Sequence, residues 1–593
     1  MARIDEAKRL FPDVHWVPLT HPDHHPIYHY RGFHPDTVEI LPVGHRYQDG
    51  RRAFGVETVF QRDMSVPVRD GAILRADIFL PNGSDKVPAI IPWSPYGKTG
   101  TGPQNYDSMG PFRMGLPLDR TSGYEKFEAP DPAEWAERGY AVVNIDARGA
   151  GDSEGDISFW GPQEAEDIYD VIDWVSRQTW CNGSVVMAGN SWLAIAQINF
   201  TSRLKHPALK AVAPWECLTD PYVHFNMRGG RPHIPKFHEM LLGGFAGHGT
   251  AEDLPGAHVN HPLFDDFWAS KKIHVENINV PIYQVASYSS QLHTRGSFEV
   301  FQKARSSRKW LRVHPYQEWY DLYRPEINDE LQRYFDFYAK GLCNGWETEV
   351  PRVRLSLLGF DGSAEPTVIE RPYDSYPIAE TRHVKYHLDA QSGRLLDGLP
   401  TSQTTVCHQG HSLSDSSDFV LHFDRRTELH GLSKVKLWMS CPEHDDMDVV
   451  VQIRKIDKQG RPLAHLNYPC PVPEAEVPDV NIAKTLGPEG YLRVSHRNTV
   501  DKEASSDIDI VYRHDSREPI LPGTIVPFEI TLWPMGMVIG PGEGILLRVS
   551  GHCMTLPECP PAVLQEPDDE NRGTHWIHTG SEYDSHLMLP VLP

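Results

Sequence analysis

The chain has 593 residues, of which 40% are apolar and 10% aromatic, and its formal net charge at pH 7 is −23. This length is too great for one ordinary hydrophobic core, so it predicts two or three domains, and the apolar content excludes a disordered chain. The negative charge excludes a nucleic-acid partner as the first hypothesis, since no run of Lys and Arg offsets it.

Cysteine spacing and hydropathy indicate the compartment. The eight cysteines are scattered without a Cys-x-x-Cys pair, which favours reduced thiols over a disulfide framework or a zinc site. No stretch reaches eighteen consecutive apolar residues, and the first residues lack the apolar core of a signal peptide. We therefore expect a cytoplasmic protein with no cofactor and no membrane partner that acts on a small-molecule substrate. Whether it forms a homo-oligomer stays open.

The first third of the chain combines an irregular arm with an α/β pattern. Residues 1–55 are rich in Pro, His and Tyr and predict an N-terminal arm packed on the body. Residues 64–81 are typical of two strands around an Asp-Gly turn. Strand and helix patterns then alternate, which predicts a mainly parallel sheet with helices on both faces and a ligand site at the carboxyl ends of its strands. These patterns cover residues 87–96, 134–139, 140–145, 163–178, 185–190 and 209–215.

Two further changes of pattern divide the rest of the chain. Residues 221–272 break the alternation and predict an inserted helical cap. Strand patterns at 280–286 and 309–314 resume the α/β domain, which therefore comprises residues 56–220 and 273–345. In residues 346–593, short alternating strands separated by Gly, Pro and Asp predict an all-β sandwich whose first strand covers 353–358.

Ser191 is the candidate nucleophile. An apolar run stops at Gly189-Asn190-Ser191 and continues with the pattern of a helix. A buried strand that turns sharply into a helix leaves the residue at the turn projecting from the sheet edge, and Gly189 lets the turn close. The fifth position of the Gly-x-Ser-x-Gly pattern is Leu193 instead of glycine. We interpret Asp146 and Arg148 as a pair that fixes the loop beside this turn.

Motifs in both halves of the chain resemble the cocaine-esterase and X-Pro dipeptidyl-peptidase family of serine hydrolases (CocE/NonD-like) over nearly the whole length. The motifs are Arg69-Asp-Gly71, Ser94-Pro-Tyr96, the glycine-rich loop 146–155, Gly189-Asn-Ser-Trp192, and the segments 523–530 and 577–587.

The resemblance implies an α/β-hydrolase fold with an inserted helical cap, followed by an all-β jelly-roll domain. It also implies that Ser191 accepts the acyl group. The oxyanion hole would be the Tyr96 hydroxyl and the backbone N–H of Trp192, placed where charge develops on the carbonyl oxygen.

The chain departs from the family pattern at the other two members of the triad. Where the family has its acid, after the seventh strand, this chain has Ser289, with the segment 292–296 following as it often does in the family. Where the family has its histidine, after the eighth strand, this chain has Glu318. A serine without a base is a poor nucleophile because its hydroxyl stays protonated near neutral pH.

Three replacements are available. His314 at a strand end could be the base, and Asp220 could be its acid, because a triad is defined by geometry. Glu318 could act as a general base if burial raised its pKa. The first pair is favoured, although His314 could instead be a strand-end histidine bonded to backbone, and Asp220 a helix N-cap or a cap-domain salt bridge.

Three functions follow. The first is a serine hydrolase that cleaves an ester, with an amide ranked second, of a small or medium apolar acyl compound through an acyl-enzyme. The second is a non-hydrolytic enzyme of secondary metabolism, performing cyclisation, aldol or elimination chemistry, and the third is an inactive binding protein. The aromatic residues considered for the substrate pocket are Trp192, Trp215, Tyr222, Phe225, Phe237, Phe245 and Tyr288.

Overall fold

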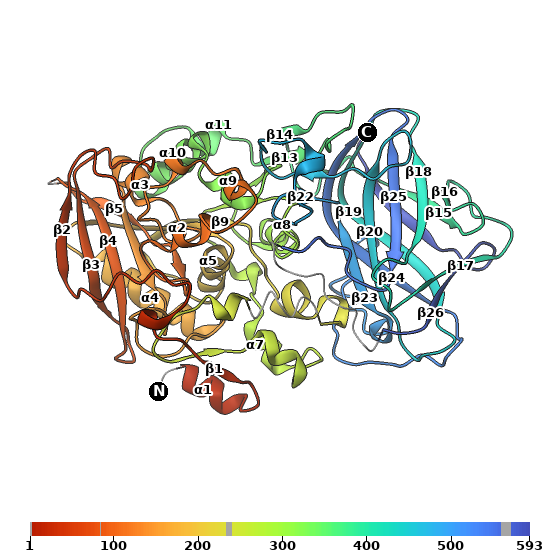
Figure 1. The fold of residues 1–593 in the computed structure, drawn as a ribbon, viewed down its shortest axis with the longest axis horizontal. Coiled ribbons are helices and arrows are strands. Elements are labelled where there is room, and N and C mark those ends of the chain that lie inside the picture. Colours follow the sequence, from red (N-terminus) through yellow and green to blue (C-terminus); the bar gives the residue numbers. More distant parts are fainter. Residues whose placement is uncertain (1–2, 84, 233–239, 559–570) are drawn as a thin grey trace.

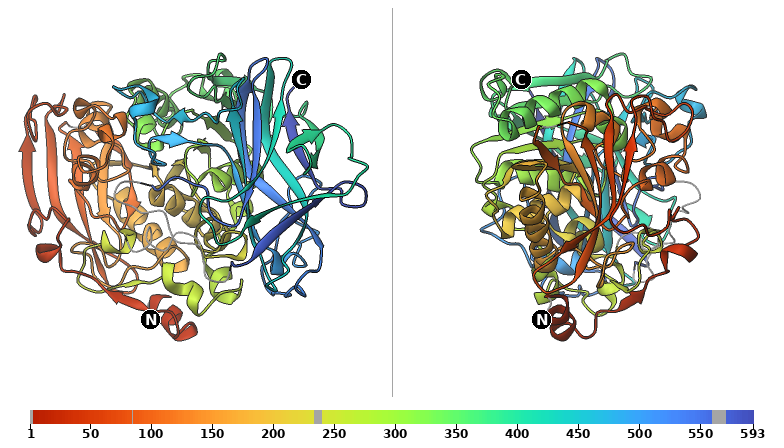
Figure 2. Two further views of the ribbon diagram at one scale, coloured as in Figure 1. Left: turned by 45° about the vertical axis from the view of Figure 1, so that its right-hand side comes forward. Right: turned by 90° about the vertical axis from the view of Figure 1, so that its left-hand side faces the viewer.

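The structure is a computed structural model and describes residues 3–83, 85–232, 240–558 and 571–593. An α/β half built from the N-terminal part of the chain stands beside a β-rich half built from the C-terminal part (Figure 1). The left view of Figure 2 shows the same arrangement, with yellow and green segments between the two sheets, and the right view shows the molecule from the end of the α/β half. Phe237 and Cys559, both considered in the sequence, lie outside the described residues.

A sheet of twelve strands organises the described part of the α/β half. Its central strands are parallel, and antiparallel strands flank them on both sides. In spatial order the strands are β14 (Val368–Tyr373), β13 (Val353–Leu357), β12 (Lys309–Val313), β11 (Ile282–Ala286), β9 (Leu209–Trp215), β8 (Cys181–Asn190), β5 (Val87–Ile90), β7 (Ala141–Asp146), β4 (Ile73–Pro81), β3 (Thr58–Pro67) and β2 (Thr37–Leu41), with β6 (Trp93–Ser94) paired to β7.

Helices cover both faces of this sheet, and β8 shows the reason. Val185 and Met187 belong to a core cluster shared with α4 (Pro162–Ser176) and α5 (Trp192–Arg203). Val186 and Ala188 belong to the opposite cluster, shared with α3 and α10. Because successive side chains of a strand point to opposite faces, a strand that is apolar throughout must be covered on both. The other helices are α2 (Thr101–Tyr106), α3 (Pro132–Glu137), α8 (Thr294–Lys303), α9 (Glu318–Leu322), α10 (Pro325–Ala339) and α11 (Trp346–Glu349).

The β-rich half is built on a second sheet with its own core cluster, in which Val435, Leu437, Ile545 and Leu547 are fully buried. Its strands in spatial order are β17 (Thr404–Gln409), β26 (Thr574–Thr579), β19 (Thr427–Ser440), β27 (His586–Val591), β15 (Arg382–Asp389), β16 (Arg394–Leu396), β18 (Ser417–His422), β25 (Gly544–Ser550), β20 (Asp448–Ile456) and β23 (Glu489–Arg493), with β24 (Val526–Ile539) paired to β19 and a small sheet of β21 (His465–Leu466) and β22 (Lys484–Thr485).

The described part of the cap consists of short helical turns and one strand, β10 (Thr250–Glu252). β10 pairs with β1 (Trp16–Pro18), so the N-terminal arm is tied to the cap. The arm also contains α1 (Arg3–Leu10) and supplies β2, so it has more regular structure than its composition predicts. The helical elements of the cap are η4 (Tyr222–Asn226), η5 (Arg228–Gly230), η6 (Pro255–Val259) and α7 (Asp266–Lys271).

Two sequence interpretations differ from the structure. The strand predicted to open the sandwich is β13, which pairs in parallel with β12 and extends the first sheet past residue 345. An alternating pattern of apolar and polar residues predicts that a segment is a strand, but it does not predict which sheet the strand joins. Arg148 does not pair with Asp146: it binds Asp167 at 2.7 Å and Asp70 at 3.1 Å, and Asp146 lies 3.1 Å from Lys98. Within the described ranges, no helix has both the length and the apolarity to cross a membrane.

Histidines buried in the β-rich half predict that the protein loses stability in mild acid. Burial lowers the pKa of six of them to about 3 or about 4: His408, His430, His496, His514, His552 and His575. In the unfolded chain these groups take up protons below about pH 6.5, whereas the folded protein does not. Stability is therefore present above that pH and is lost as pH falls toward 4. Each proton taken up on unfolding contributes about 1.4 kcal/mol per pH unit.

The measurement is the urea midpoint as a function of pH. We expect a steep fall on the acid side, and a shallower one in His575→Gln. His274→Gln changes an exposed histidine and should keep the native slope. A midpoint that does not respond to pH would show that these histidines are charged in the folded protein.

Candidate active site

Ser191 stands at the sharp turn between β8 and α5. Its backbone has φ 51° and ψ −117°, a left-handed conformation that a non-glycine residue adopts only when its surroundings enforce it. Its N–H lies 3.1 Å from the carbonyl oxygens of Trp215 and Glu216, which hold the turn against the neighbouring strand β9. The side chain is half-buried at the carboxyl edge of the sheet.

Gly189 and Leu193 explain the missing second glycine of the pattern. A Cβ atom on Gly189 would lie 2.5 Å from Leu193 Cδ2 and 2.8 Å from the carbonyl oxygen of Glu128. Gly189 also has φ +137°, which L residues rarely adopt. Leu193 therefore packs into the space that Gly189 leaves free, and the turn closes with one glycine.

The histidine in contact with Ser191 is His293, in the loop that joins β11 to α8. Its Nε2 lies 3.2 Å from Ser191 Oγ. Its Nδ1 lies 3.1 Å from Glu318 Oε2 and 2.9 Å from Ser290 Oγ. If Nε2 accepts the serine proton, the ring hydrogen is on Nδ1 and is donated to Glu318 and Ser290. Ser191, His293 and Glu318 thus stand in the order nucleophile, base and acid.

Burial sets the charge of this group. His293 is 4% exposed and Glu318 5% exposed. Burial lowers the pKa of His293 to about 4, so the ring is neutral and able to accept a proton near neutral pH. Burial, together with the charge of Glu558, raises the pKa of Glu318 to about 8. The carboxyl of Glu318 also interacts with that of Glu216.

The loop that carries His293 is held from the cap and from the β-rich half. Arg228 Nη2 donates a hydrogen bond to the carbonyl oxygen of Gln291, two residues before His293. The Arg228 guanidinium lies 4.7 Å from the ring centre of Trp533 on β24. Tyr491 OH, on β23 of the β-rich half, donates to Gln291 Oε1 at 3.4 Å. Both halves of the molecule therefore fix the imidazole.

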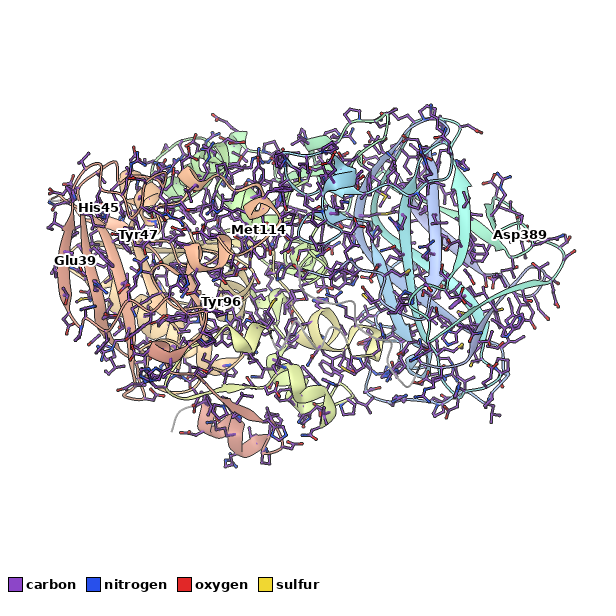
Figure 3. The ribbon with its side chains drawn as sticks, in the orientation of Figure 1. Glu39, His45, Tyr47, Tyr96, Met114 and Asp389 are labelled. Atoms are coloured by element: carbon purple, nitrogen blue, oxygen red, sulfur yellow. The ribbon has the colours of Figure 1, made fainter. Side chains whose placement is uncertain are left out.

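Tyr96 is the second side chain that interacts with Ser191. Its hydroxyl interacts with the Ser191 side chain, and burial raises its pKa well above the usual value, so it stays protonated and can donate. Figure 3 marks Tyr96 toward the middle of the molecule, and Tyr47 nearer the outer end of the α/β half. Trp192 is the first residue of α5, where a backbone N–H has no acceptor within the helix.

The structure does not bring His314 and Asp220 to the nucleophile. His314 is fully buried; its Nε2 lies 3.1 Å from Glu216 Oε1 and its Nδ1 accepts the N–H of Tyr316. Asp220 Oδ1 accepts the N–H of Tyr222 at 3.0 Å, and its other oxygen lies 3.3 Å from Lys272 Nζ. Asp220 thus accepts backbone N–H groups at the start of η4 and makes the salt bridge considered as one of its structural alternatives. Ser289 bonds Ser287 and the carbonyl oxygen of Tyr316.

Three of the aromatic residues considered for the substrate pocket, Trp215, Tyr222 and Phe225, are core residues. Trp215 is fully buried, and its indole N–H donates to Asp321. The Tyr222 hydroxyl donates to the carbonyl oxygen of Pro262, and Phe225 is 3% exposed. Tyr288 lines a small cavity between the His293 loop and β24. The rings beside Tyr96 are instead those of Phe127, Trp192 and Phe245, with centroids 5.3, 6.2 and 6.1 Å from its own.

His293 is the candidate base that the sequence reasoning missed. The available signal was a double exchange: the segment after the seventh strand lacks an acid but contains His293, and the segment after the eighth has Glu318 at the position of the family histidine. Glu216, His293 and Glu318 also form the one group in the described ranges able to hold a metal ion, with ligand atoms within 4.8 Å of one another. Those atoms already contact one another or Ser191, so we propose no metal.

Comparisons with known proteins agree with this architecture. Residues 70–255 match the X-Pro dipeptidyl-peptidase (S15 family) model, and residues 344–588 match the X-Pro dipeptidyl-peptidase C-terminal non-catalytic domain. A predicted serine esterase from Mycobacterium bovis is 31% identical, over 89% of this chain and 94% of the relative. The cocaine esterase of a Rhodococcus strain is 30% identical over 27% of this chain and 24% of its own.

A solved structure extends the likeness to the whole fold. The CocE/NonD family hydrolase from Staphylococcus aureus superposes with a TM-score of 0.83 at 31% identity, covering 96% of this chain and 98% of that one. The fold and these relatives define a hydrolase with an α/β-hydrolase domain and a β-rich C-terminal domain. The chain belongs to the family of cocaine esterases and X-Pro dipeptidyl-peptidases.

The turn at Gly189 generates a direct test. Gly189→Ala should destabilise the protein by roughly 1–3 kcal/mol or more, because the new methyl group meets both Leu193 and a backbone oxygen at a left-handed φ. Adding Leu193→Ala should restore only part of the loss, since the contact with Glu128 remains. Urea unfolding of the single and double variants measures this. Native stability in Gly189→Ala would contradict the packing described.

Proposed function

We propose that the protein cleaves esters of small or medium apolar acyl compounds through an acyl-enzyme on Ser191, with His293 as base and Glu318 as acid. The observation that carries the proposal is the 3.2 Å contact between Ser191 Oγ and His293 Nε2, with Glu318 on the other ring nitrogen. The carboxylate would orient the imidazole and stabilise its charged form, as in other triads. Relatives named as esterases support an ester as the first substrate class.

The reaction would proceed in two halves. Ser191 Oγ attacks the carbonyl carbon while its proton passes to His293 Nε2, and the oxygen that becomes negative is received by the Tyr96 hydroxyl and the N–H of Trp192. The C–O bond to the alcohol then breaks, and the leaving oxygen takes the proton from Nε2. Water repeats the sequence on the acyl-enzyme, which releases the acid and restores Ser191.

The aromatic residues around Tyr96 support an apolar acyl group. Phe245 comes from the cap and Trp192 follows the nucleophile, and their ring centroids lie 6.1 and 6.2 Å from that of Tyr96. Phe159 lies behind them, with its ring centroid 4.7 Å from that of Trp192. Aromatic surfaces of this kind favour flat or branched apolar groups. A non-hydrolytic enzyme or an inactive binding protein was considered because no histidine stands at the usual position of the base. In the proposed triad His293 supplies that base.

The base assignment is tested with a fluorophosphonate probe and p-nitrophenyl esters. The native protein should be labelled and active, and Ser191→Ala should be neither. His293→Gln should lower kcat by at least about a thousandfold, because the serine proton has no acceptor. His274→Gln, which changes an exposed histidine, should keep native activity. Full activity in His293→Gln, or loss of activity only in His314→Gln, would contradict the assignment.

The oxyanion role of Tyr96 is tested by Tyr96→Phe, which removes one hydrogen-bond donor and leaves the ring. We expect kcat to fall on the order of a hundredfold with little change in KM, because the lost bond forms mainly in the transition state. Tyr47→Phe is the matched control, since Tyr47 is 48% exposed and nearer the outer end of the α/β half. An equal effect of the two substitutions would exclude the role.

A further inference from the structure

Glu216, which has no assigned role, stands directly behind the proposed acid. It follows β9 and has a left-handed backbone with φ 55°. Its carbonyl oxygen accepts the N–H of Ser191, and its own N–H donates to Val285 on β11 at 3.0 Å. Its backbone is thus fixed both to the nucleophile turn and to the strand that precedes His293.

The side chain of Glu216 joins two further groups. It is fully buried, and one of its carboxyl oxygens lies within 4.8 Å of a carboxyl oxygen of Glu318, so that the two carboxyl groups interact. Its Oε1 lies 3.1 Å from His314 Nε2, although the ring N–H does not point directly at it. Because His314 Nδ1 accepts a backbone N–H, the ring hydrogen of the neutral form is on Nε2, which faces Glu216.

On the side of His314 away from Glu216, the network ends at a buried ion pair. Asp321 lies 3.7 Å from His314 Nε2 and receives two hydrogen bonds of 2.7 Å from Arg312. Burial alone would raise the pKa of Asp321, but the Arg312 guanidinium holds it well below the usual range. Arg312 and Asp321 are both fully buried, and their opposite charges form an ion pair.

The two glutamates form the unusual part of the network. Two carboxylates in contact cannot bond each other unless one carries a proton, and two charges so close in a buried site are strongly disfavoured. Burial and the neighbouring charge of Glu318 raise the pKa of Glu216 to about 7. The pair therefore holds at least one proton at neutral pH.

We propose that Glu216 is a positioning residue that shares one proton with Glu318, so that the acid behind His293 is a carboxyl–carboxylate pair. The Glu216 O–H donates to Glu318, stabilises its charged form and leaves its other oxygen for Nδ1 of His293. His314 Nε2 lies 3.1 Å from Glu216 Oε1 on the other side. This inference rests on the proposed function, since it concerns the acid of that triad.

Several charged or titratable groups face the pair from the elements packed around it. Glu558 and Glu128 act on Glu318 from neighbouring segments, and their charges would oppose its ionisation. Other titratable or charged groups around the pair are Tyr96, Cys217, Arg228, His293, Arg312, His314 and Asp321.

The test compares Glu216→Gln with Glu216→Leu. Glutamine can donate an amide N–H to Glu318 and accept from His314, whereas leucine can do neither. We expect the acid limb of the kcat/KM profile to stay close to the native position in Glu216→Gln. In Glu216→Leu it should move to higher pH by about one unit or more, because the charged form of Glu318 has lost its donor. Glu276→Gln, an exposed site, should match the native profile.

A purely structural role for Glu216 would lower kcat without moving the acid limb, and an unmoved limb in folded Glu216→Leu would overturn the inference. If Glu216→Leu does not fold, the shared proton can be tested by comparing infrared spectra of the native protein and Glu216→Gln. The native protein should show one more protonated-carboxyl band near neutral pH, and identical spectra would overturn the inference. Ser191→Ala reports separately on the function, because full activity in that variant would remove the triad itself.

Discussion

The proposed chemistry depends on two parallel strands that end side by side. β11 and β12 pair along their whole length, from Ile282 opposite Lys309 to Ala286 opposite Val313. The loops that follow therefore leave the same edge of the sheet, beside the turn that carries Ser191. One loop delivers His293 and the other Glu318, and their side chains meet 3.1 Å apart. The family arrangement places the acid on the first loop and the base on the second, so the two loops can exchange roles without any change of fold.

Burial has opposite effects on the two titratable members of the proposed triad. A neutral imidazole suits the base, and burial keeps His293 neutral. The same burial opposes the charge of Glu318, which needs a donor, and Glu216 is placed to supply one. The β-rich half contributes by closing the site: Trp533 stacks on Arg228, which in turn holds the backbone at Gln291. The second domain is thus part of the support of the imidazole, although it supplies none of the proposed triad.

Much of this was predictable from the sequence, and the misses have physical reasons. The parallel sheet and the turn at Ser191 follow from apolar runs that end in glycine, because such runs need covering on both faces. Membership of β13 in the first sheet was missed because alternation in a strand does not name its partners. His314 was favoured because it ends a strand, yet its ring is enclosed by Glu216 and Asp321. His293 was missed because its contact with Ser191 joins residues far apart in the sequence, and only the coordinates bring them together.

An experimental structure of the protein after reaction with a fluorophosphonate tests the central claim most directly. The account predicts phosphorus bonded to Ser191 Oγ, His293 Nε2 within hydrogen-bond distance of that oxygen or of the leaving-group position, and Glu318 on Nδ1. It also predicts that the Tyr96 hydroxyl and the Trp192 N–H point at the phosphonyl oxygen. An adduct with His314 or no imidazole at that oxygen, or a label on another residue, would contradict it.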